Sequence, residues 1–525
     1  MSDMIAKNRI ALTSLVGVVL ALLGLVYVLN LERIQRRALE WFMVLKPNSM
    51  LSNLWQSPNL SIAVNIYIFN WTNSEHFNDP NVKPRFEELG PYSFTESQQK
   101  MNVVWHLENS TVSYLRRSRF YFNATASSGK LNDTIVCPNT LSVGLLNKMQ
   151  NWSPFLRTLM LMAMNMYGTE ATFKRSADDW LFNGFDTPLI KMSKMVPTKM
   201  IPQLHFPYER IGYGYPRNSS TEIYGHFNVY TGLQDFSKLG QIARWRYDNV
   251  TNGHPKCKLR GSMGEFHPSP LRQGEPISFF LPDLCRELKI DYAGTMDFEG
   301  LEAYVYKGSA RNMANGTDNP ENSCYCTDNC REVRSGLLNI STCWYDVPIF
   351  ASSPHFYNAD PYYADAVDGM KPDKDRHEIT VILEPKTAML LDIKARLMIS
   401  LLVEPRPESV FRKSRSNFFP LVWADYRVRI SPDLLFYLKL VPISALVGKV
   451  CGFVAIALGV MMVLWYPRQM LLQKHFMRKI DITSMETRMQ AATANTELKN
   501  YAVEGSPLLV GLQFVAASDD SQRAS

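Results

Sequence analysis

Two long apolar runs stand near the two ends of the chain. The first, residues 10–29, carries no charged side chain, and at 1.5 Å per residue its twenty positions span the roughly 30 Å hydrocarbon core of a bilayer. The second, residues 450–466, is shorter, so we expect its helix to begin near residue 443, with Lys449 close enough to the interface to extend into it. The pattern predicts transmembrane helices at residues 10–31 and 443–466.

A signal peptide is the alternative interpretation of the first run. The run is longer than the roughly 7–15 apolar residues of such a peptide, and it ends in Asn30, Leu31 and Glu32 instead of a small-residue cleavage site. We therefore expect it to stay in the protein as a membrane anchor.

The charges that flank the two runs predict the orientation of the chain. Arg33, Arg36 and Arg37 follow the first run and argue for an external N-terminus, whereas the basic cluster after the second run argues for a cytosolic C-terminus. We give the second cluster more weight. Both termini, residues 1–9 and 467–525, are then cytosolic, and residues 32–442 form an ectodomain. The C-terminal segment is polar and is predicted to be partly disordered.

Between the runs, strand-like and helix-like patterns are mixed. Alternating or β-rich stretches predict strands, and 3.6-residue spacing predicts helices. The strands are expected at residues 61–70, 101–122, 378–385 and 394–404, and the helices at residues 32–45, 141–149, 152–166 and 176–182. Leu156, Leu159, Met160, Met164 and Tyr167 form an apolar band on one of these helices, which in most proteins is a packed core face.

Composition narrows the function. Apolar residues make up 46% of the 525 positions, enough for a large core, and the net charge of +7 comes from basic residues spread along the chain. The basic residues do not form a patch of the kind that binds nucleic acid, so we do not expect nucleic-acid binding. The motifs of a nucleophile elbow, a zinc protease, a dinucleotide fold and a phosphate loop are all missing, so we expect neither an enzyme nor a cofactor. A solvated loop explains Asp368, Asp373 and Asp375 better than calcium does, because no glutamate closes an EF-hand there.

Acceptor patterns for N-glycosylation lie only between the two apolar runs, in agreement with an extracellular or lumenal ectodomain. They begin at Asn59, Asn70, Asn109, Asn123, Asn132, Asn151, Asn218, Asn249, Asn315 and Asn339.

Four of the eight cysteines cluster at Cys324, Cys326, Cys330 and Cys343. Their spacing is irregular for zinc, and the neighbouring acceptor site at Asn339 favours the oxidising secretory route, so we expect disulfide bonds more than a metal site. The residues alone do not choose among the pairings.

Several segments of the ectodomain resemble the class B scavenger receptor family, which includes fatty-acid translocase, a lysosomal integral membrane protein, insect croquemort and the sensory neuron membrane proteins. The resemblance is carried by Lys-Pro-Arg-Phe-Glu-Glu-Leu-Gly-Pro-Tyr-Ser-Phe at residues 83–94, Ser-Gly-Leu-Leu-Asn-Ile at residues 335–340 and Ser-Pro-His-Phe at residues 353–356. In the first segment, Gly90-Pro91 is expected to form a turn into a strand that begins at Tyr92. His355, in the last of these segments, and His377, in a further matching segment, are expected to be satisfied core residues.

The resemblance implies an α+β fold: an antiparallel β-barrel-like ectodomain with an apical helical bundle at about residues 141–185, an internal apolar tunnel and two transmembrane helices. It implies the pairs Cys257–Cys324, Cys285–Cys343 and Cys326–Cys330. It also implies that Met160, Met164 and Tyr167 take part in ligand capture.

Function follows from the same resemblance. The protein is expected to capture lipids or lipoprotein-type ligands and to deliver them through the tunnel to the membrane. An endosomal or lysosomal protein-sorting receptor is the first alternative, and an ectoenzyme is the second. In the C-terminal tail, Glu504, Leu508 and Leu509 fit an acidic dileucine signal for clathrin adaptors. We therefore expect a plasma-membrane protein that cycles to endosomes or lysosomes.

Overall fold

The computed structural model describes residues 2–58, 62–167, 170–195, 208–251, 254–326, 333–408 and 410–501 of the chain. It divides into two compact units. One unit is the ectodomain, Ile34–Ile443, and the other joins Met1–Arg33 to Ser444–Ser525.

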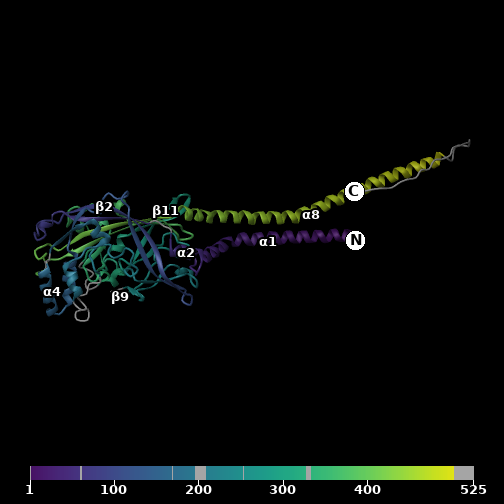
Figure 1. Cartoon of the computed structure of the whole chain (residues 1–525). Coiled ribbons are helices and arrows are strands. Elements are labelled where there is room, and N and C mark those ends of the chain that lie inside the picture. The colour runs from purple at the N-terminus through teal and green to yellow at the C-terminus, as the bar shows by residue number, and fades with distance from the viewer. Residues whose placement is uncertain are drawn as a thin grey trace. The chain divides into compact units, whose positions relative to one another are not determined.

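A large antiparallel sheet forms the ectodomain (Figure 1). Thirteen strands of the described chain belong to it. Eleven follow one hydrogen-bonded path, namely β10 (Ile277–Leu281), β11 (Arg286–Phe298), β12 (Leu301–Gly308), β15 (Thr380–Leu383), β16 (Leu390–Val403), β17 (Asn417–Arg429), β1 (Ile62–Trp71), β2 (Phe86–His106), β3 (Thr111–Phe122), β6 (His226–Tyr230) and β7 (Ile242–Trp245). The other two are β14 (Ile349–Ser352), which pairs with β16, and β13 (Leu338–Asn339), which pairs with β14.

A short segment at Ser262 bridges the two ends of this path and nearly closes the sheet into a barrel. Ser262 forms an antiparallel bridge to Gln241, beside β7, and a parallel bridge to Phe279 in β10. Gly261 precedes it at φ +94°, and a Cβ atom there would lie 2.7 Å from the backbone carbon of Phe279. Only glycine allows the two backbones to approach so closely.

The long strands agree with the alternating pattern of the sequence, with one correction. β2 runs without a break through Gly90 and Pro91, which form a bulge inside the strand and not the predicted turn before it. The register between β1 and β2 shifts at this point, and a Cβ atom on Gly90 would lie 2.8 Å from the carbonyl oxygen of Ile66. The glycine therefore serves a close strand approach within the sheet.

Helices occupy the insertion between strands β4 (Thr134–Pro138) and β5 (Thr172–Ser176), which pair with each other. The insertion holds α3 (Thr140–Lys148) and α4 (Pro154–Tyr167), close to the predicted bounds. Asn139 caps α3 by accepting a hydrogen bond from the Ser142 N–H at 2.9 Å. After β5, the predicted helix is a short π-helical turn, Asp179–Asn183. The remaining short elements of the ectodomain include α2 (Met50–Gln56), α5 (Pro188–Met195), α6 (Pro361–Asp365), α7 (Lys374–His377), β8 (Val250–Thr251) and β9 (His254–Lys258).

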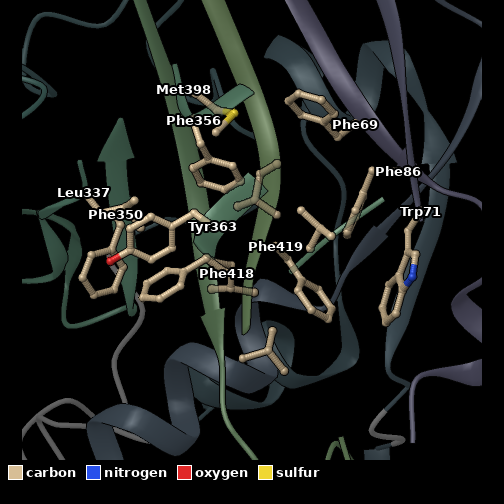
Figure 2. Close-up of a cluster of buried hydrophobic side chains, with 14 of the residues drawn as sticks. Phe69, Trp71, Phe86, Leu337, Phe350, Phe356, Tyr363, Met398, Phe418 and Phe419 are labelled. Atoms are coloured by element: carbon tan, nitrogen blue, oxygen red, sulfur yellow. The ribbon is translucent and has the colours of Figure 1, made fainter. Parts of the chain in front are cut away.

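An aromatic cluster packs between β1, β2, β17 and the segment that follows β14 (Figure 2). Trp71 stands edge-on to Phe419, with ring centroids 4.9 Å apart, and stacks on Phe86. Phe356 and Tyr363 bring the segment after β14 into the same cluster. Aromatic pairs of this kind contribute more than their buried area alone, so the cluster fixes that segment against the barrel wall.

Most of two long helices, α1 (Ser2–Met43) and α8 (Pro432–Tyr501), belongs to the second unit, and both helices are long and apolar enough to cross a membrane. Glycines form their contact: a Cβ atom on Gly459 would lie 2.5 Å from the carbonyl oxygen of Gly17, and one on Gly452 would lie 2.3 Å from a methyl carbon of Val28. α8 starts earlier than predicted, at Pro432. It also continues to Tyr501, where the sequence suggested partial disorder, since helix-forming residues dominate beyond Pro467.

Candidate functional site

A cavity of about 570 Å³ lies inside the barrel. Its walls are mainly aliphatic and come from strands on several sides of the sheet, including Ile66, Leu288, Val381, Ile393, Leu397 and Val422. This volume is within the range of sites that hold one small organic molecule, and the apolar lining favours a hydrocarbon ligand.

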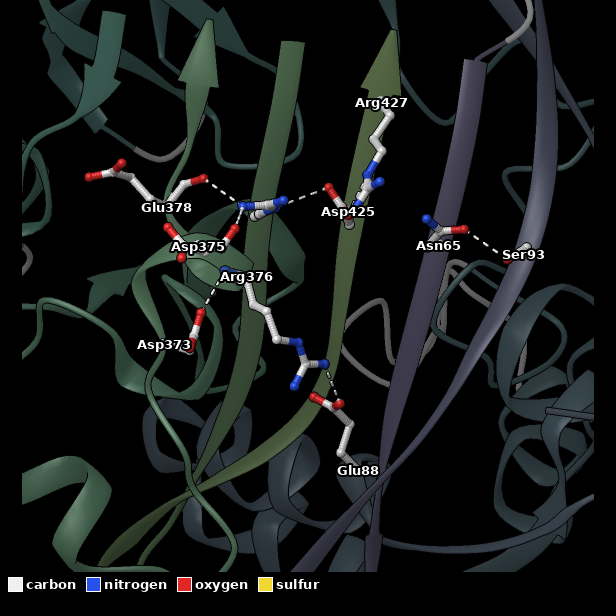
Figure 3. Close-up of polar contacts among 10 residues, drawn as sticks. Asn65, Glu88, Ser93, Asp373, Asp375, Arg376, Glu378, Asp425 and Arg427 are labelled. Carbon is white, nitrogen blue, oxygen red and sulfur yellow. Dashed lines mark hydrogen bonds and ion pairs between the residues drawn. The ribbon is translucent and has the colours of Figure 1, made fainter. Parts of the chain in front are cut away.

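Strand alternation explains why the cavity is apolar while the opposite face of the same strands is charged. On β17, Ala424 and Tyr426 line the cavity, and Asp425 between them points away from it. Figure 3 shows Asp425 in a polar network on this opposite face, where it pairs with Arg396 at 3.2 Å and with Arg427 at 2.6 Å. The two ion pairs of Asp425 therefore stay outside the cavity.

One end of the cavity lies against the helices α3 and α5. Leu141, Gly144 and Lys148 on α3 and Ile190 on α5 all line it. The sequence predicted helices at this end, and the structure shows that α3 faces the cavity directly.

The predicted capture residues do not share one environment. Met160 and Met164 are 2% and 3% exposed and pack in a cluster with Leu145 and Leu146 of α3, whereas Tyr167 is 42% exposed. None of the three is among the described residues that line the cavity. A second apolar row lies on the outward face of α4, at Phe155, Leu159, Met162 and Met166. The sequence could not tell which of the two apolar rows of α4 packs inward.

Charged and hydroxyl side chains also line part of the cavity, which the sequence analysis missed. Arg217 pairs with Asp283 at 2.6 Å, and the Arg116 guanidinium lies 3.9 Å from the centroid of the Tyr224 ring. Burial alone would lower the pKa of Arg217, but Asp283 and the neighbouring tyrosines, Tyr224 first among them, together outweigh burial and raise the pKa. Glu96 completes this group. The sequence did contain a signal for Glu96 and Arg116. Each lies an even number of positions along its strand from buried apolar residues, so it faces the same side of the sheet as they do.

Two disulfide bonds join Cys257 to Cys324 and Cys285 to Cys343, the pairs that the resemblance implies. Cys324 and Cys343 are therefore not zinc ligands. Cys326 is also disulfide-bonded, and Cys330 lies outside the described residues. Cys137 is a free, buried thiol, and burial raises its pKa to about 12.

All the glycosylation acceptors that the structure describes belong to the ectodomain. Asn59 lies outside the described residues. Asn70, Asn123, Asn315 and Asn339 are half-buried, and the side-chain nitrogen of Asn315 donates to the carbonyl oxygen of Val333 at 3.0 Å. The exposed acceptors are Asn109, Asn132, Asn151, Asn218 and Asn249, and these are the most accessible for modification.

His355 and His377 stack on each other, with centroids 4.7 Å apart, beside Glu88 and Arg376. Both ring nitrogens of His355 have hydrogen-bond partners, as predicted. The prediction is wrong for His377: its Nδ1 accepts from the Asp373 N–H at 2.9 Å, but its Nε2 is buried with no hydrogen-bond partner among the described residues.

The model of the CD36 family matches residues 15–470, which is most of the chain. The chain belongs to the CD36 family. Among its relatives, Protein peste of Drosophila melanogaster is 34% identical over 432 residues, covering 81% of this chain and 76% of peste. Scavenger receptor class B member 1 of Bos taurus is 28% identical over 467 residues, covering 87% and 89% of the two chains. Lysosome membrane protein 2 of Rattus norvegicus is 27% identical over 430 residues, covering 81% and 86%.

Membership in the CD36 family agrees with the resemblance to class B scavenger receptors found in the sequence. The nearly closed antiparallel sheet, the mixture of helix and strand, and the two apolar terminal helices agree with the predicted fold class. The CD36-family chain is therefore a scavenger-receptor-like membrane protein.

Proposed function

We propose that this CD36-family protein captures lipids or lipoprotein-type particles and passes single lipid molecules through the ectodomain cavity to the membrane. The observation that carries the proposal is the apolar cavity of about 570 Å³, which lies directly against α3 and α5. A lipid that leaves water at the apical helices enters a cavity whose walls are apolar, like its own hydrocarbon chain. The mechanism is binding and transfer, with no catalytic step.

The outward face of α4 supports capture at the same end of the ectodomain. Phe155 is 76% exposed, Met162 62% and Met166 77%, and these residues share one face of the helix. Exposed apolar rows of this kind mark interaction sites, and methionine adapts to ligands of different shape. Met160 and Met164 pack against Leu145 and Leu146 of α3. We therefore propose that they contribute to capture only indirectly, by supporting α3.

Filling the cavity separates transfer from capture. Ala395 and Ala424 both line the cavity, so Ala395→Phe with Ala424→Trp should block passage while the outward face of α4 stays intact. In cells that display the full-length protein, we expect this variant to bind lipoprotein particles normally and to transfer a fluorescent cholesteryl ester at a rate near that of untransfected cells. Ala63→Trp, on an exposed position of β1, is the matched control. Unchanged lipid transfer in the filled variant would contradict the proposal.

A separate variant tests the capture step. Met162→Gln with Met166→Gln makes the outward face of α4 polar without touching the core methionines. We expect particle binding to fall several-fold while the protein still reaches the surface. If binding falls only in Met160→Gln with Met164→Gln, and that variant folds, capture depends on the inner row.

A protein-sorting receptor is the second candidate, and the relative named Lysosome membrane protein 2 favours it. The predicted signal at Glu504, Leu508 and Leu509 lies outside the described residues. We propose that it binds a clathrin adaptor and directs cycling between the plasma membrane and endosomes or lysosomes. Leu508→Ala with Leu509→Ala should raise the abundance of the protein at the cell surface. An unchanged distribution of the protein would show that the motif is not a sorting signal. A soluble protein that co-purifies with the ectodomain in place of lipid would favour sorting over lipid transfer.

We propose that both termini are cytosolic. The basic residues after the second apolar run and the two membrane-length helices support this topology. Protease added outside sealed cells should remove neither an N-terminal nor a C-terminal tag. Loss of the N-terminal tag alone would show that α1 has the opposite orientation.

A further inference from the structure

The part of α8 that follows Pro467 carries a row of exposed apolar side chains. Phe476 is 67% exposed and Met477 64%, and the row also includes Leu472 and Ile480. A helix gains most of its stability by packing an apolar face against a second surface, and these side chains have no such packing within the described chain. A row of this kind therefore indicates an interaction surface.

Helical spacing separates the apolar side chains from the charged ones over residues 468–484. At about 100° per residue, these positions divide the helix surface into two halves. The uncharged half holds Met470, Leu472, Phe476, Met477 and Ile480 together with the neutral residues Gln469, Gln473, Thr483 and Ser484. The charged half holds Arg468, Lys474, His475, Arg478, Lys479 and Asp481, with two apolar residues, Leu471 and Ile482, among them.

The charged half is strongly basic. Asp481 is its single carboxylate, against four cations at Arg468, Lys474, Arg478 and Lys479. A helix with one apolar face and one basic face binds in the plane of an anionic membrane, since the apolar face enters the acyl region while the cations stay among the head groups. Each Lys or Arg near such a surface strengthens binding roughly fivefold. Charge and apolar character thus favour the same partner.

The segment begins where α8 is expected to leave the bilayer. The second apolar run ends at residue 466, and Trp465 has the position that aromatic side chains take at a membrane interface. Pro467 follows at once, inside the helix. A proline there removes a backbone hydrogen bond and favours a bend, which would turn the next residues from the crossing direction into the plane of the surface.

We propose that residues 468–484 form a surface helix that binds the anionic phospholipids of the cytosolic leaflet. The uncharged half enters the acyl region, and the cations of the charged half contact the head groups. This inference goes beyond the transfer of lipid through the ectodomain cavity, and it rests only on the proposed cytosolic position of the C-terminus. It gives the protein a second contact with lipid, which is selected by head-group charge.

Labels on the two halves test the orientation of the segment in the full-length protein. Met477→Cys places an environment-sensitive fluorophore on the uncharged half, and Ile482→Cys places one on the charged half. Both are made with Cys451→Ala, and the remaining free thiol, Cys137, is buried. The proteins are reconstituted in nanodiscs of phosphatidylcholine alone and of equal parts phosphatidylcholine and phosphatidylserine. The two leaflets of a nanodisc are alike, so the result does not depend on the topology of the chain.

The label at position 477 should brighten several-fold when phosphatidylserine is present, whereas the label at position 482 should stay dim. A label at position 477 that is dim in both nanodiscs would overturn the inference, because the segment then extends into water. Equal emission from that label in both nanodiscs would also overturn it, since neutral lipid or a protein, such as a second copy of the chain, would then cover the uncharged half. Equal brightening at both positions would contradict the proposed orientation.

Removal of charge tests the role of the cations. Arg478→Gln with Lys479→Gln, in the protein labelled at position 477, should weaken attachment to the phosphatidylserine surface roughly thirtyfold. Added salt should weaken it in the same way. Arg488→Gln, on an exposed position of α8 beyond the segment, is the matched control and should keep the brightening. Brightening that persists in the double variant would show that the cations do not select the lipid.

Removal of apolar side chains tests the uncharged half. Leu472→Gln with Phe476→Gln should abolish the brightening of the label at position 477. Leu471→Gln with Ile482→Gln removes the same number of apolar side chains from the charged half and should keep it. Equal loss in the two variants would contradict the assignment of the halves. None of these changes alters the ectodomain, so lipid transfer through the cavity is measured separately, and its failure would leave this inference standing.

Discussion

His355 donates a hydrogen bond from its Nε2 to the carboxylate of Glu88 at 2.5 Å, across 267 positions of sequence. The direction of this bond is fixed, because the backbone N–H of Lys371 donates to Nδ1 of the same ring at 3.1 Å and that nitrogen must therefore accept. Glu88 also accepts hydrogen bonds from Arg376 at 2.9 Å and from Trp423 at 2.8 Å. One carboxylate thus connects β2, β17 and the segments after β14. Figure 3 shows its contact with Arg376.

Glu88→Gln should destabilise the ectodomain. Burial would raise the pKa of Glu88, but the hydrogen bonds from His355 and Arg376 outweigh it and lower the pKa to about 2. A shift of this size corresponds to about 3 kcal/mol, and an amide placed against three donors would lose most of it. Chemical unfolding of the full-length protein in detergent would measure the loss. Glu87→Gln, exposed on the same strand, should show almost none.

Stability should also depend on pH through His377. Burial and the neighbouring His355 lower the pKa of His377 to about 4, below the value of about 6.5 for an unfolded histidine. The neutral ring is favoured in the folded state, so this contribution is complete above pH 6.5 and is lost as the pH falls toward 4. We expect unfolding midpoints to decrease over this range, with His267, whose pKa burial lowers to about 4, acting in the same direction.

His377→Asn isolates this contribution. The asparagine oxygen can still accept from the Asp373 N–H, and the side chain cannot be protonated. Part of the decrease between pH 6.5 and 4 should disappear, by about 1–3 kcal/mol. His76→Asn, on an exposed position, should retain the full decrease. Equal pH profiles for the wild type and His377→Asn would show that the buried ring does not control acid stability.

Loss of the Cys285–Cys343 bond should be costly. The two residues are separated by 58 positions, and closing a loop of this length in the unfolded chain corresponds to about 4 kcal/mol in the chain-entropy account. Cys285→Ser with Cys343→Ser should therefore lower the yield of folded ectodomain sharply. Cys137→Ala, which alters a free thiol, should be tolerated better. Peptide mapping without reduction would confirm the bonds in the wild type and test whether Cys326 pairs with Cys330.

Gly459→Leu should separate the two membrane helices. Any side chain at this position meets the backbone of Gly17 and Ala21, and small residues are what allow helices to pack closely in lipid. Thermal unfolding in detergent should occur several degrees lower than in the wild type. Ala457→Leu, on an exposed position of α8, is the control. If both variants unfold at the wild-type temperature, the contact between α1 and α8 adds little to stability.

Local patterns predicted much of the fold, because strand alternation and helical spacing depend on near neighbours. β1, α3, α4 and both apolar helices appeared close to their predicted places. The exception at Gly90-Pro91 has a physical reason: a glycine that permits a close strand approach and a glycine in a turn look alike in sequence. The start of α8 at Pro432 was missed because the helix begins before its apolar portion.

The site was harder to predict than the fold. Whether Met160 or Met162 faces inward depends on where α3 packs, which is a tertiary fact. Glu96 and Arg116 line the same cavity only because β2 and β3 pair in one particular register. The resemblance supplied the cavity and the cysteine pairs, but not the polar atoms of the cavity wall.

The two methionine rows of α4 differ in their exposure to oxidants. Met162 and Met166 are accessible in an oxidising compartment, whereas Met160 and Met164 are sealed in the core. Conversion to the sulfoxide would turn the outward face of the helix polar while leaving its packing intact. We therefore expect oxidative damage to reduce particle capture by this protein before it reduces folding, and methionine sulfoxide reductase to restore capture without any refolding.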